Sequence, residues 1–330
     1  MSLERSWYAG AWWLKLFRPL SALFRFLAAR QRLARTAQQW HAPVPVIVVG
    51  NITLGGSGKT PVTLALIEML RARGYKPGVV SRGYGGKPPK YPFAVTVDTS
   101  PAQGGDEPCL IVQRTGVPLV IDPDRPAAVR ALLEESDCNI VISDDGLQHY
   151  ALGRDLELAV VDARRGLGNG RCVPEGPLRE PPERLAQVDR VILNGVGAFS
   201  FAGASHMQLV PGKLVELTTE RELGSDQWTG SHRVHALAGI GHPARFFDTL
   251  RTLGFDPIEH PLRDHASIEP EQLRFEPELP LIMTEKDAVK CRGWSPAHCW
   301  ALRVDARFDA GFEPWLDLQL NRLQQRYGSP

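Results

Sequence analysis

Residues 44–61, VPVIVVGNITLGGSGKTP, give the strongest indication of the fold. Residues 44–50 are a short β-branched run that ends in glycine, which is typical of a buried parallel strand. From Pro61 to Arg73 the apolar residues recur at helical spacing. A glycine-rich loop between a strand and a helix allows backbone N–H groups to converge on phosphate oxygens at the positive end of the helix. The segment therefore predicts a phosphate-binding loop.

Within this loop, the side chains of Lys59 and Thr60 have the expected chemistry. Lys59 can reach the β- and γ-phosphates, and the Thr60 hydroxyl can ligate Mg²⁺. Thr53 stands where the usual pattern has its first glycine, and the alternative interpretation is an ordinary glycine-rich turn. We expect the following residues to contact the nucleotide: Thr53, Leu54, Gly55, Gly56, Ser57, Gly58, Lys59 and Thr60.

The residues that follow alternate between strand and helix patterns, which predicts an α/β fold. Strands are expected at 78–81, 118–121, 139–143, 156–162 and 190–194, with a helix at 127–135. This order indicates a P-loop NTPase-like parallel sheet with helices on both faces. Two short runs around Pro211-Gly212 indicate a hairpin. A second, smaller α/β pattern follows, with strands at 234–240, 279–284 and 300–304 and helices at 243–253 and 312–326.

We therefore expect four parts in the chain. Residues 1–41 form an N-terminal helical segment, and 42–205 form the P-loop domain. Residues 206–230 form a β-hairpin linker, and 231–330 form a C-terminal α/β domain.

Acidic residues at the end of a predicted strand provide the second half of a nucleotide site. Asp144 and Asp145 follow the strand at 139–143, and adjacent carboxylates there are costly unless a cation or phosphate chemistry uses them. The alternative is a helix cap followed by a turn aspartate. A third cluster, Gly104 to Pro108, alone indicates a turn.

Composition narrows the functional classes. The 330 residues are 43% hydrophobic and 23% charged, with a net charge of +1, which excludes a disordered chain and a disulfide scaffold. The near-neutral charge argues against a nucleic-acid partner. Five widely spaced cysteines without a CxxC pair are typical of a reducing compartment.

The N-terminal 41 residues differ from the rest, with seven Lys or Arg side chains and one Glu. Charges interrupt every apolar run, which excludes a membrane span and fits a signal peptide poorly. On a helix, one arc gathers these apolar side chains: Trp13, Leu16, Phe17, Leu20, Leu23, Phe24 and Leu27. Lys15, Arg18 and Arg25 lie opposite, and Pro19 divides the stretch into two helical pieces. The pattern predicts a helix at an anionic membrane surface; the alternative is a helix packed on its own domain.

Seven motifs in order along the chain resemble the tetraacyldisaccharide 4′-kinases, the lipid A 4′-kinases of Gram-negative bacteria. They are GNITLGGSGKTP (50–61), SRGYGG (81–86), GDEP (105–108), DDGLQH (144–149), GNGRCVPEGPLREP (168–181), DH (264–265) and TEKDAVK (284–290). The resemblance implies two α/β domains joined by a β linker. It also implies transfer of the γ-phosphoryl of ATP to the 4′-hydroxyl of a tetraacylated glucosamine disaccharide 1-phosphate, forming lipid IVA. The expected location is peripheral, on the cytoplasmic face of the inner membrane.

The resemblance also implies roles for individual residues. Asp106 would accept the proton of the sugar hydroxyl, supported by His265 from the second domain. Asp144 would serve the Mg²⁺ ion and Asp145 the catalytic charge network. Four further residues would line the nucleotide site: Gln148, His149, Arg179 and Glu180.

Two other functions remain open from the residues alone. One is a membrane-associated ATPase of the deviant P-loop type, as in partitioning proteins and metal pumps. Those proteins usually carry a signature lysine just before the glycine pair, where this chain has Leu54. The other is a nucleotide-gated membrane adaptor, in which Asp106 and His265 would have no catalytic task.

Overall fold

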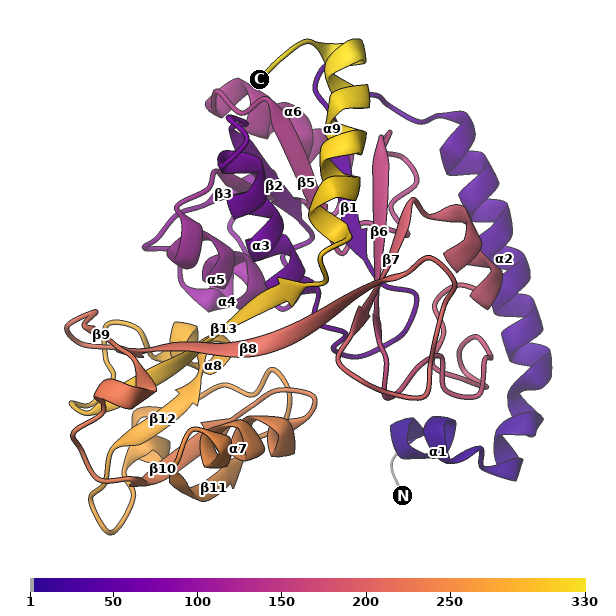
Figure 1. Cartoon of the computed structure of the whole chain (residues 1–330). Helices are drawn as coiled ribbons and strands as arrows, with labels where there is room; N and C mark the ends of the chain where they lie inside the picture. Colours follow the sequence, from indigo (N-terminus) through magenta and orange to yellow (C-terminus); the bar gives the residue numbers. More distant parts are fainter. Residues whose placement is uncertain (1–2) are drawn as a thin grey trace.

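In the part of the chain that the structure describes, a sheet of 13 strands extends through both halves of the molecule (Figure 1). The computed structural model describes residues 3–330. The strand order is β11-β10-β12-β13-β8-β7-β6-β1-β5-β2-β4-β3, with β9 paired to β8. The two halves predicted from the sequence are therefore joined by an unbroken hydrogen-bonded sheet.

The first half is a parallel sheet covered on both faces. Its strands are β1 (Val46–Gly50), β2 (Pro77–Ser81), β4 (Leu119–Ile121), β5 (Ile140–Asp144), β6 (Leu156–Asp162) and β7 (Arg190–Asn194), with β3 (Phe93–Val95) antiparallel at the edge. Its main helices are α3 (Lys59–Arg71), α5 (Asp106–Thr115) and α6 (Arg125–Glu135). Ile47 and Val49 point into one core and Val48 into another, because successive side chains of a strand face opposite sides. The expected P-loop NTPase-like architecture is confirmed.

The second half carries the remaining strands. They are β8 (Ser205–Glu216), β9 (Glu222–Leu223), β10 (Arg233–Ala238), β11 (Asp256–Pro261), β12 (Leu281–Thr284) and β13 (Cys299–Phe308). Its helices are α7 (Pro243–Thr252) and α8 (Glu285–Cys291). Long strands β8 and β13 pair antiparallel and connect the halves in Figure 1.

The predicted hairpin at Pro211-Gly212 is wrong, because both residues lie inside β8. Pro211 lies opposite Val304, where the register of the pair shifts. A bulge of this kind tolerates a residue that lacks an N–H. The chain turns instead between β8 and β9, where Glu220 donates its backbone N–H to the Glu216 carbonyl.

The last helix, α9 (Phe312–Tyr327), packs on the first half rather than the second. Phe312, Leu316 and Leu320 share a core with Ile67 of α3, and Figure 1 shows α9 beside α3 and β1. Packing therefore argues for ending the second domain before residue 312, whereas the predicted interval ran to 330. The four-part division otherwise stays a prediction.

The N-terminal segment forms α1 (Leu3–Ala9), the 3₁₀ helix η1 (Trp12–Phe17) and α2 (Arg18–Ala37). Pro19 lies in the first turn of α2, so the expected division at this proline is confirmed. Short helices elsewhere are α4 (Pro101–Gly104), η2 (Pro182–Gln187), η3 (Ser225–Gln227) and η4 (Pro270–Leu273). Among the described residues, no helix combines the length and apolar character that crossing a bilayer requires.

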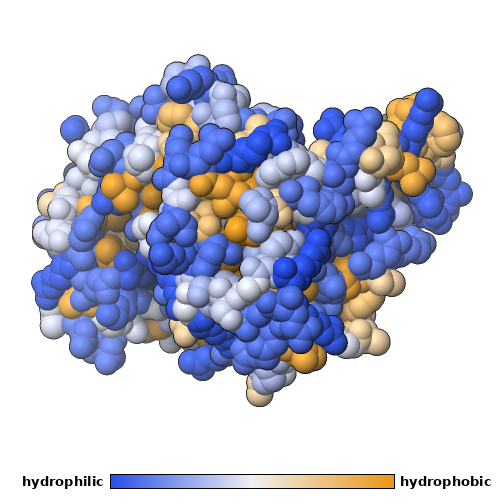
Figure 2. Space-filling model, turned by 90° about the horizontal axis from the view of Figure 1, so that it is seen from above, coloured by the Kyte–Doolittle hydropathy of each residue, from blue (hydrophilic) through white to orange (hydrophobic). Residues whose placement is uncertain are grey.

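Helix α2 contacts the body through polar side chains and leaves apolar ones exposed. Ser21 donates to the Cys172 carbonyl (3.0 Å), and Arg18 pairs with Glu175 (3.0 Å). The α2 residues Leu20, Leu23, Phe26, Leu27 and Leu33 are each more than half exposed, as is Leu16 of η1. Apolar residues gather on the projection at the right of Figure 2, the side on which α2 lies in Figure 1.

Candidate functional site

The glycine-rich loop connects β1 to α3 and is fixed from several sides. Gln148 donates to the Asn51 carbonyl (3.0 Å), and Asn194 donates to the Ser57 carbonyl (3.0 Å). The backbone N–H of Leu54 donates to the Pro177 carbonyl (2.8 Å). Gly58 has a φ of 93°, and a Cβ there would lie 2.4 Å from the Asn194 side chain. The loop is therefore pre-formed at the N-terminus of α3, as an anion site requires.

Lys59, at the start of α3, lies in a charged cluster at the end of β5. Its Nζ is 3.6 Å from Asp145, and Arg179 donates to the same carboxylate at 3.0 Å. Burial raises the pKa of Asp145, but the charges of Lys59 and Arg179 outweigh that effect and lower it to about 2. Asp145 has a φ of 47°, a left-handed conformation. The structure thus brings three of the predicted residues together.

Asp144 is buried beside the loop and has a different environment. Thr63 donates to one carboxylate oxygen (3.2 Å) and Ser81 lies at 3.5 Å from the other. Burial, followed by the charges of Glu107 and Asp145, raises the pKa of Asp144 to about 7. A hard cation would offset the cost of ionising this carboxylate. The hydroxyl of Thr60 and the carboxylate of Asp144 are oxygen donors of the kind that Mg²⁺ prefers, so these residues fit the predicted metal.

Gln148 and Glu180 contact each other beside the loop, and His149 follows Gln148 in the chain. Gln148 donates to Glu180 (2.7 Å), and Tyr150 donates to the other oxygen of the same carboxylate. Burial and then the charge of Arg125 lower the pKa of His149 to about 3. These contacts connect Gln148 and Glu180 to the loop backbone, so in this structure both support the loop.

Asp106 and His265 come from opposite halves of the molecule and meet. The His265 Nδ1 is 3.2 Å from Asp106 Oδ2. Asp106 begins α5 instead of lying in the turn that the Gly104–Pro108 cluster alone indicates. Helices α5 and α8 pack against each other and hold the two halves in register here. His265 has a φ of 60°, and its ring meets the Tyr84 ring edge-on at 5.5 Å between centroids.

Two lysines of α8 complete this cluster and were not predicted as site residues. Lys290 lies 3.6 Å from Asp106, and Lys286 lies 3.1 Å from His265 Nε2. Burial raises the pKa of Asp106, but the hydrogen bond from His265 and the charges of Lys290 and Lys286 hold it below its usual value. Both lysines lie in the TEKDAVK motif, so a signal was present, but nothing in the sequence places α8 beside α5.

A second contact between the halves lies beside the loop and was also missed. Arg245 of α7 donates to Asp162 at the end of β6 (2.7 Å). Arg165 donates to the Gly56 carbonyl, and its guanidinium lies over the Tyr8 ring of α1. The sequence shows these charges but gives no indication of their partners.

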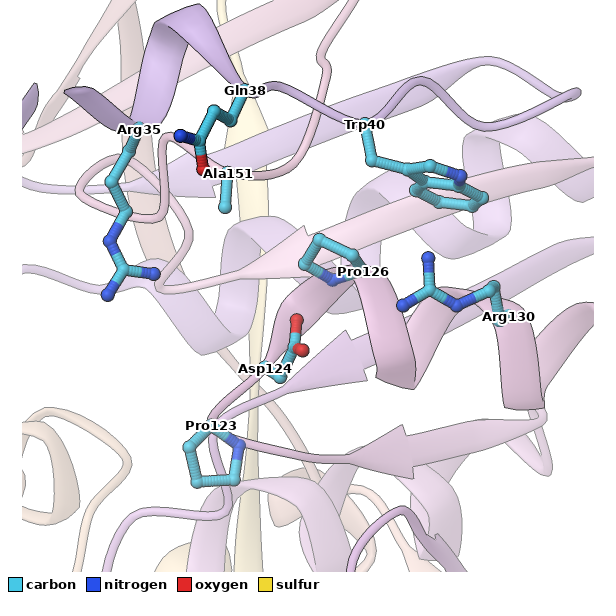
Figure 3. Close-up of a pocket in the computed structure, with 8 residues that line it drawn as sticks. All are labelled: Arg35, Gln38, Trp40, Pro123, Asp124, Pro126, Arg130 and Ala151. Carbon is cyan, nitrogen blue, oxygen red and sulfur yellow. The ribbon is translucent and has the colours of Figure 1, made fainter. Parts of the chain in front are cut away.

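A separate hollow of about 480 Å³ lies between the C-terminal end of α2 and the start of α6 (Figure 3). The guanidinium of Arg130 lies over the Trp40 ring there, 5.0 Å from its centroid. None of the predicted nucleotide, metal or base residues lines this hollow.

The fold and the loop define a P-loop nucleotide-binding protein of the α/β class, with a carboxylate–histidine pair between its two halves. The family model for tetraacyldisaccharide-1-P 4′-kinase matches residues 13–321. The chain belongs to this family.

Relatives and a solved structure agree with that assignment. The chain is 56% identical to the tetraacyldisaccharide 4′-kinase of Azotobacter vinelandii, over 97% of both chains. It is 56% identical to that of Ectopseudomonas mendocina, again over 97% of both. It is also similar to the crystal structure of LpxK from Aquifex aeolicus in complex with ATP. That match has 26% identity and a TM-score of 0.78, and covers 94% of this chain and 99% of that one.

Proposed function

We propose that this chain is an ATP-dependent kinase that phosphorylates the 4′-hydroxyl of a tetraacyldisaccharide 1-phosphate, giving the lipid A precursor lipid IVA. The observation that carries this proposal is the pairing of Asp106 with His265 beside the phosphate loop. A Cβ on Gly241 would lie 3.8 Å from Asp264, the neighbour of His265, and 4.0 Å from the loop amide of Gly56, which supports placing the pair and the loop in one site. Membership of the family supports the same reaction.

The residues can perform the transfer in one step. A sugar hydroxyl is a weak nucleophile and needs a carboxylate near its proton. Asp106 would accept that proton as the hydroxyl oxygen bonds to the γ-phosphorus. The bond between the γ-phosphorus and the bridging oxygen then breaks, and ADP leaves with that electron pair. Lys59 and the loop amides would stabilise the charge on the phosphates.

Mg²⁺ is a further part of the proposal. Thr60 and Asp144 would hold it, and the ion would neutralise charge on the β- and γ-phosphates. Asp145, bound to Lys59 and Arg179, would keep these cations oriented toward the nucleotide. The loop residues would line the nucleotide, with His149 and Arg179 beside them, while Gln148 and Glu180 would hold the loop in place.

The lipid substrate and the membrane location belong together in this proposal. A four-chain lipid leaves a bilayer only at great cost, since each buried methylene contributes about 0.8 kcal/mol. The enzyme must then work at the membrane surface, and the exposed leucines of α2 with the nearby arginines suit that surface. We infer a peripheral location on the cytoplasmic face of the inner membrane of a Gram-negative bacterium, where ATP is available.

One assay separates this function from its alternatives. Labelled ATP is incubated with the protein, with and without a tetraacyldisaccharide 1-phosphate in mixed micelles. Label transferred to the lipid would support the kinase, whereas ATP hydrolysis at the same rate with and without lipid would support the ATPase. ATP binding without either product would support the adaptor. Leu54 in place of the signature lysine and the family match both disfavour the ATPase.

A further inference from the structure

The His265 ring is held between a carboxylate and an ammonium group. On one side its Nδ1 lies 3.2 Å from Asp106 Oδ2. On the other its Nε2 lies 3.1 Å from the Nζ of Lys286. The Lys286 side chain is largely buried, with 16% of its surface exposed, so its position is well constrained.

Hydrogen-bond chemistry allows only one proton arrangement for this chain of groups. A lysine ammonium has three donors and no acceptor, so a hydrogen bond between Lys286 and His265 must run from Nζ to Nε2. Nε2 then carries no proton, and the ring proton lies on Nδ1, facing Asp106. An ionised carboxylate is the matching acceptor, because it can only accept.

The surroundings of Lys286 support an ammonium there. Asp264 accepts from it at 3.0 Å, and the carboxylate of Glu107 lies 3.8 Å away, so two negative charges face this group. Lys286 lies one turn before Lys290 on α8, and Lys290 contacts the carboxylates of Asp106 and Asp287. The two lysines therefore contact different members of the pair.

We propose that Lys286 is a positioning residue that acts with Asp106 on the His265 ring: by donating to Nε2 it keeps that nitrogen unprotonated, with the single ring proton on Nδ1 directed at Asp106. This inference rests on the proposed function and assigns the roles within it. The Nδ1–H occupies Oδ2 of Asp106, which leaves Oδ1 to accept the proton of the substrate hydroxyl. His265 then orients the base, and Asp106 is the group that takes the proton.

The test reads the tautomer directly, without turnover. The full-length protein in detergent is labelled with ¹⁵N-histidine, and long-range ¹H–¹⁵N spectra report which ring nitrogen is protonated. His265→Asn identifies the His265 signals. We expect a proton on Nδ1 alone in the wild type. In Lys286→Met, Asp106 still accepts from Nδ1 but no ammonium faces Nε2, so we expect a larger fraction of rings that carry a proton on Nε2 as well.

Lys290→Met is the matched control, the same substitution one turn along the same helix. It should leave the His265 tautomer unchanged, and Lys286→Arg, which keeps a charged donor, should retain the wild-type form. An Nε2-protonated ring in the wild type would overturn the proposal. So would a Lys286→Met variant in which Nε2 stays unprotonated to the same extent as in the wild type. The signals of buried His235 report whether each variant is folded. A variant that fails to fold leaves the wild-type tautomer as the deciding measurement.

Kinetics supply the second readout. Lys286→Met should lower kcat about 10- to 100-fold, less than loss of the base itself, with little change in the KM for ATP. A rise in KM at unchanged kcat would contradict a positioning role. If the wild type transfers no phosphate to any acylated disaccharide, the proposed function fails, while the tautomer result stands by itself.

Discussion

Lys59 is the residue whose loss separates folding from catalysis most cleanly. Its Nζ pairs with the carboxylate of Asp145, which Arg179 also binds. Lys59→Ala should therefore leave the fold intact but reduce kcat by about 10²-fold or more, because it removes a charge directed at the phosphates. The measurement is phosphate transfer to lipid at saturating ATP, with thermal unfolding alongside. Lys213→Ala, which removes an exposed lysine paired with Glu222, is the control; near-normal transfer in Lys59→Ala would refute the loop assignment.

Asp106 gives the sharpest test of the base. Asp106→Asn should lower kcat by roughly 10²–10⁴-fold with little change in ATP affinity. In the double variant Asp106→Asn/His265→Ala, the fold reduction in kcat should be smaller than the product of the two single reductions, because paired groups act as a unit. Strictly multiplicative losses would disprove the pairing. If Asp106→Asn kept wild-type kcat, Asp145 would become the next candidate base.

The pH dependence of kcat follows from the same carboxylate. The pKa of Asp106 lies below its usual value, and the base acts only when ionised. Protonation of Asp106 should therefore reduce kcat only when the pH falls through this lowered pKa. Between pH 7 and pH 5 Asp106 should stay ionised, and its titration should not lower kcat. Lys290→Met removes one cause of the lowering, so its acidic limb should move toward higher pH. If kcat fell at the same acidic pH in the wild type and in Lys290→Met, this explanation would be contradicted.

At the scale of elements, α2 carries the membrane prediction. Leu20, Leu23 and Leu27 are each more than half exposed on this helix. Replacing all three with glutamine keeps helix propensity but removes apolar surface, so we expect weaker binding to vesicles that contain anionic lipid. Vesicle flotation measures the bound fraction, and Leu318→Gln on the exposed face of α9 is the control. Unchanged flotation of the triple variant would favour the alternative, a helix that only packs on its own domain.

Helices and strands were predicted correctly where the apolar periodicity was strong. The predictions failed where contacts between distant parts of the chain determine the local structure. The buried run at β1 and the apolar spacing of α3 are local signals, and the structure has both within two residues of the expected bounds. Helix α5 was missed because Gly105 and Pro108 suggest a turn, whereas packing against α8 stabilises the helix. Pro211 suggested a turn for the same local reason, but pairing with β13 keeps β8 extended. The Asp106–His265 contact needed the resemblance, because 159 residues separate its members.

At the scale of the whole molecule, a buried ion pair joins the halves. Arg114 of α5 donates to both oxygens of Glu285 of α8, at 2.8 and 2.7 Å. Arg114→Met would leave the Glu285 carboxylate buried without this partner, so we expect a loss of about 3 kcal/mol in the free energy of unfolding. Urea unfolding measures it. The exposed pair of Arg71 and Glu68 is the control, and Arg71→Met should cost under about 1 kcal/mol.

The pKa of Glu285 determines how the stability loss of Arg114→Met depends on pH. Burial keeps its pKa above the usual value despite Arg114, and Arg114→Met should raise it further. A carboxyl with a raised folded pKa contributes stability below its unfolded pKa and loses that contribution as pH rises through the folded value. The variant should therefore lose more stability at pH 8 than at pH 5, and adding Glu285→Gln should recover part of the loss. An equal loss at both pH values would contradict the buried-charge explanation.

The pairing of strands β8 and β13 indicates how the gene for such a chain can arise. Residues 217–298 leave the first half along β8 and return along β13, with Val215 opposite Ala301 and Leu214 opposite Leu302. Both ends of this interval therefore lie side by side, which is the arrangement that tolerated domain insertions share. One short turn from β8 to β13 could replace residues 217–298 and leave the sheet of the first half continuous. In genetic terms, the segment that supplies His265 and Lys286 has the layout of a cassette inserted at one point of a nucleotide-binding ancestor.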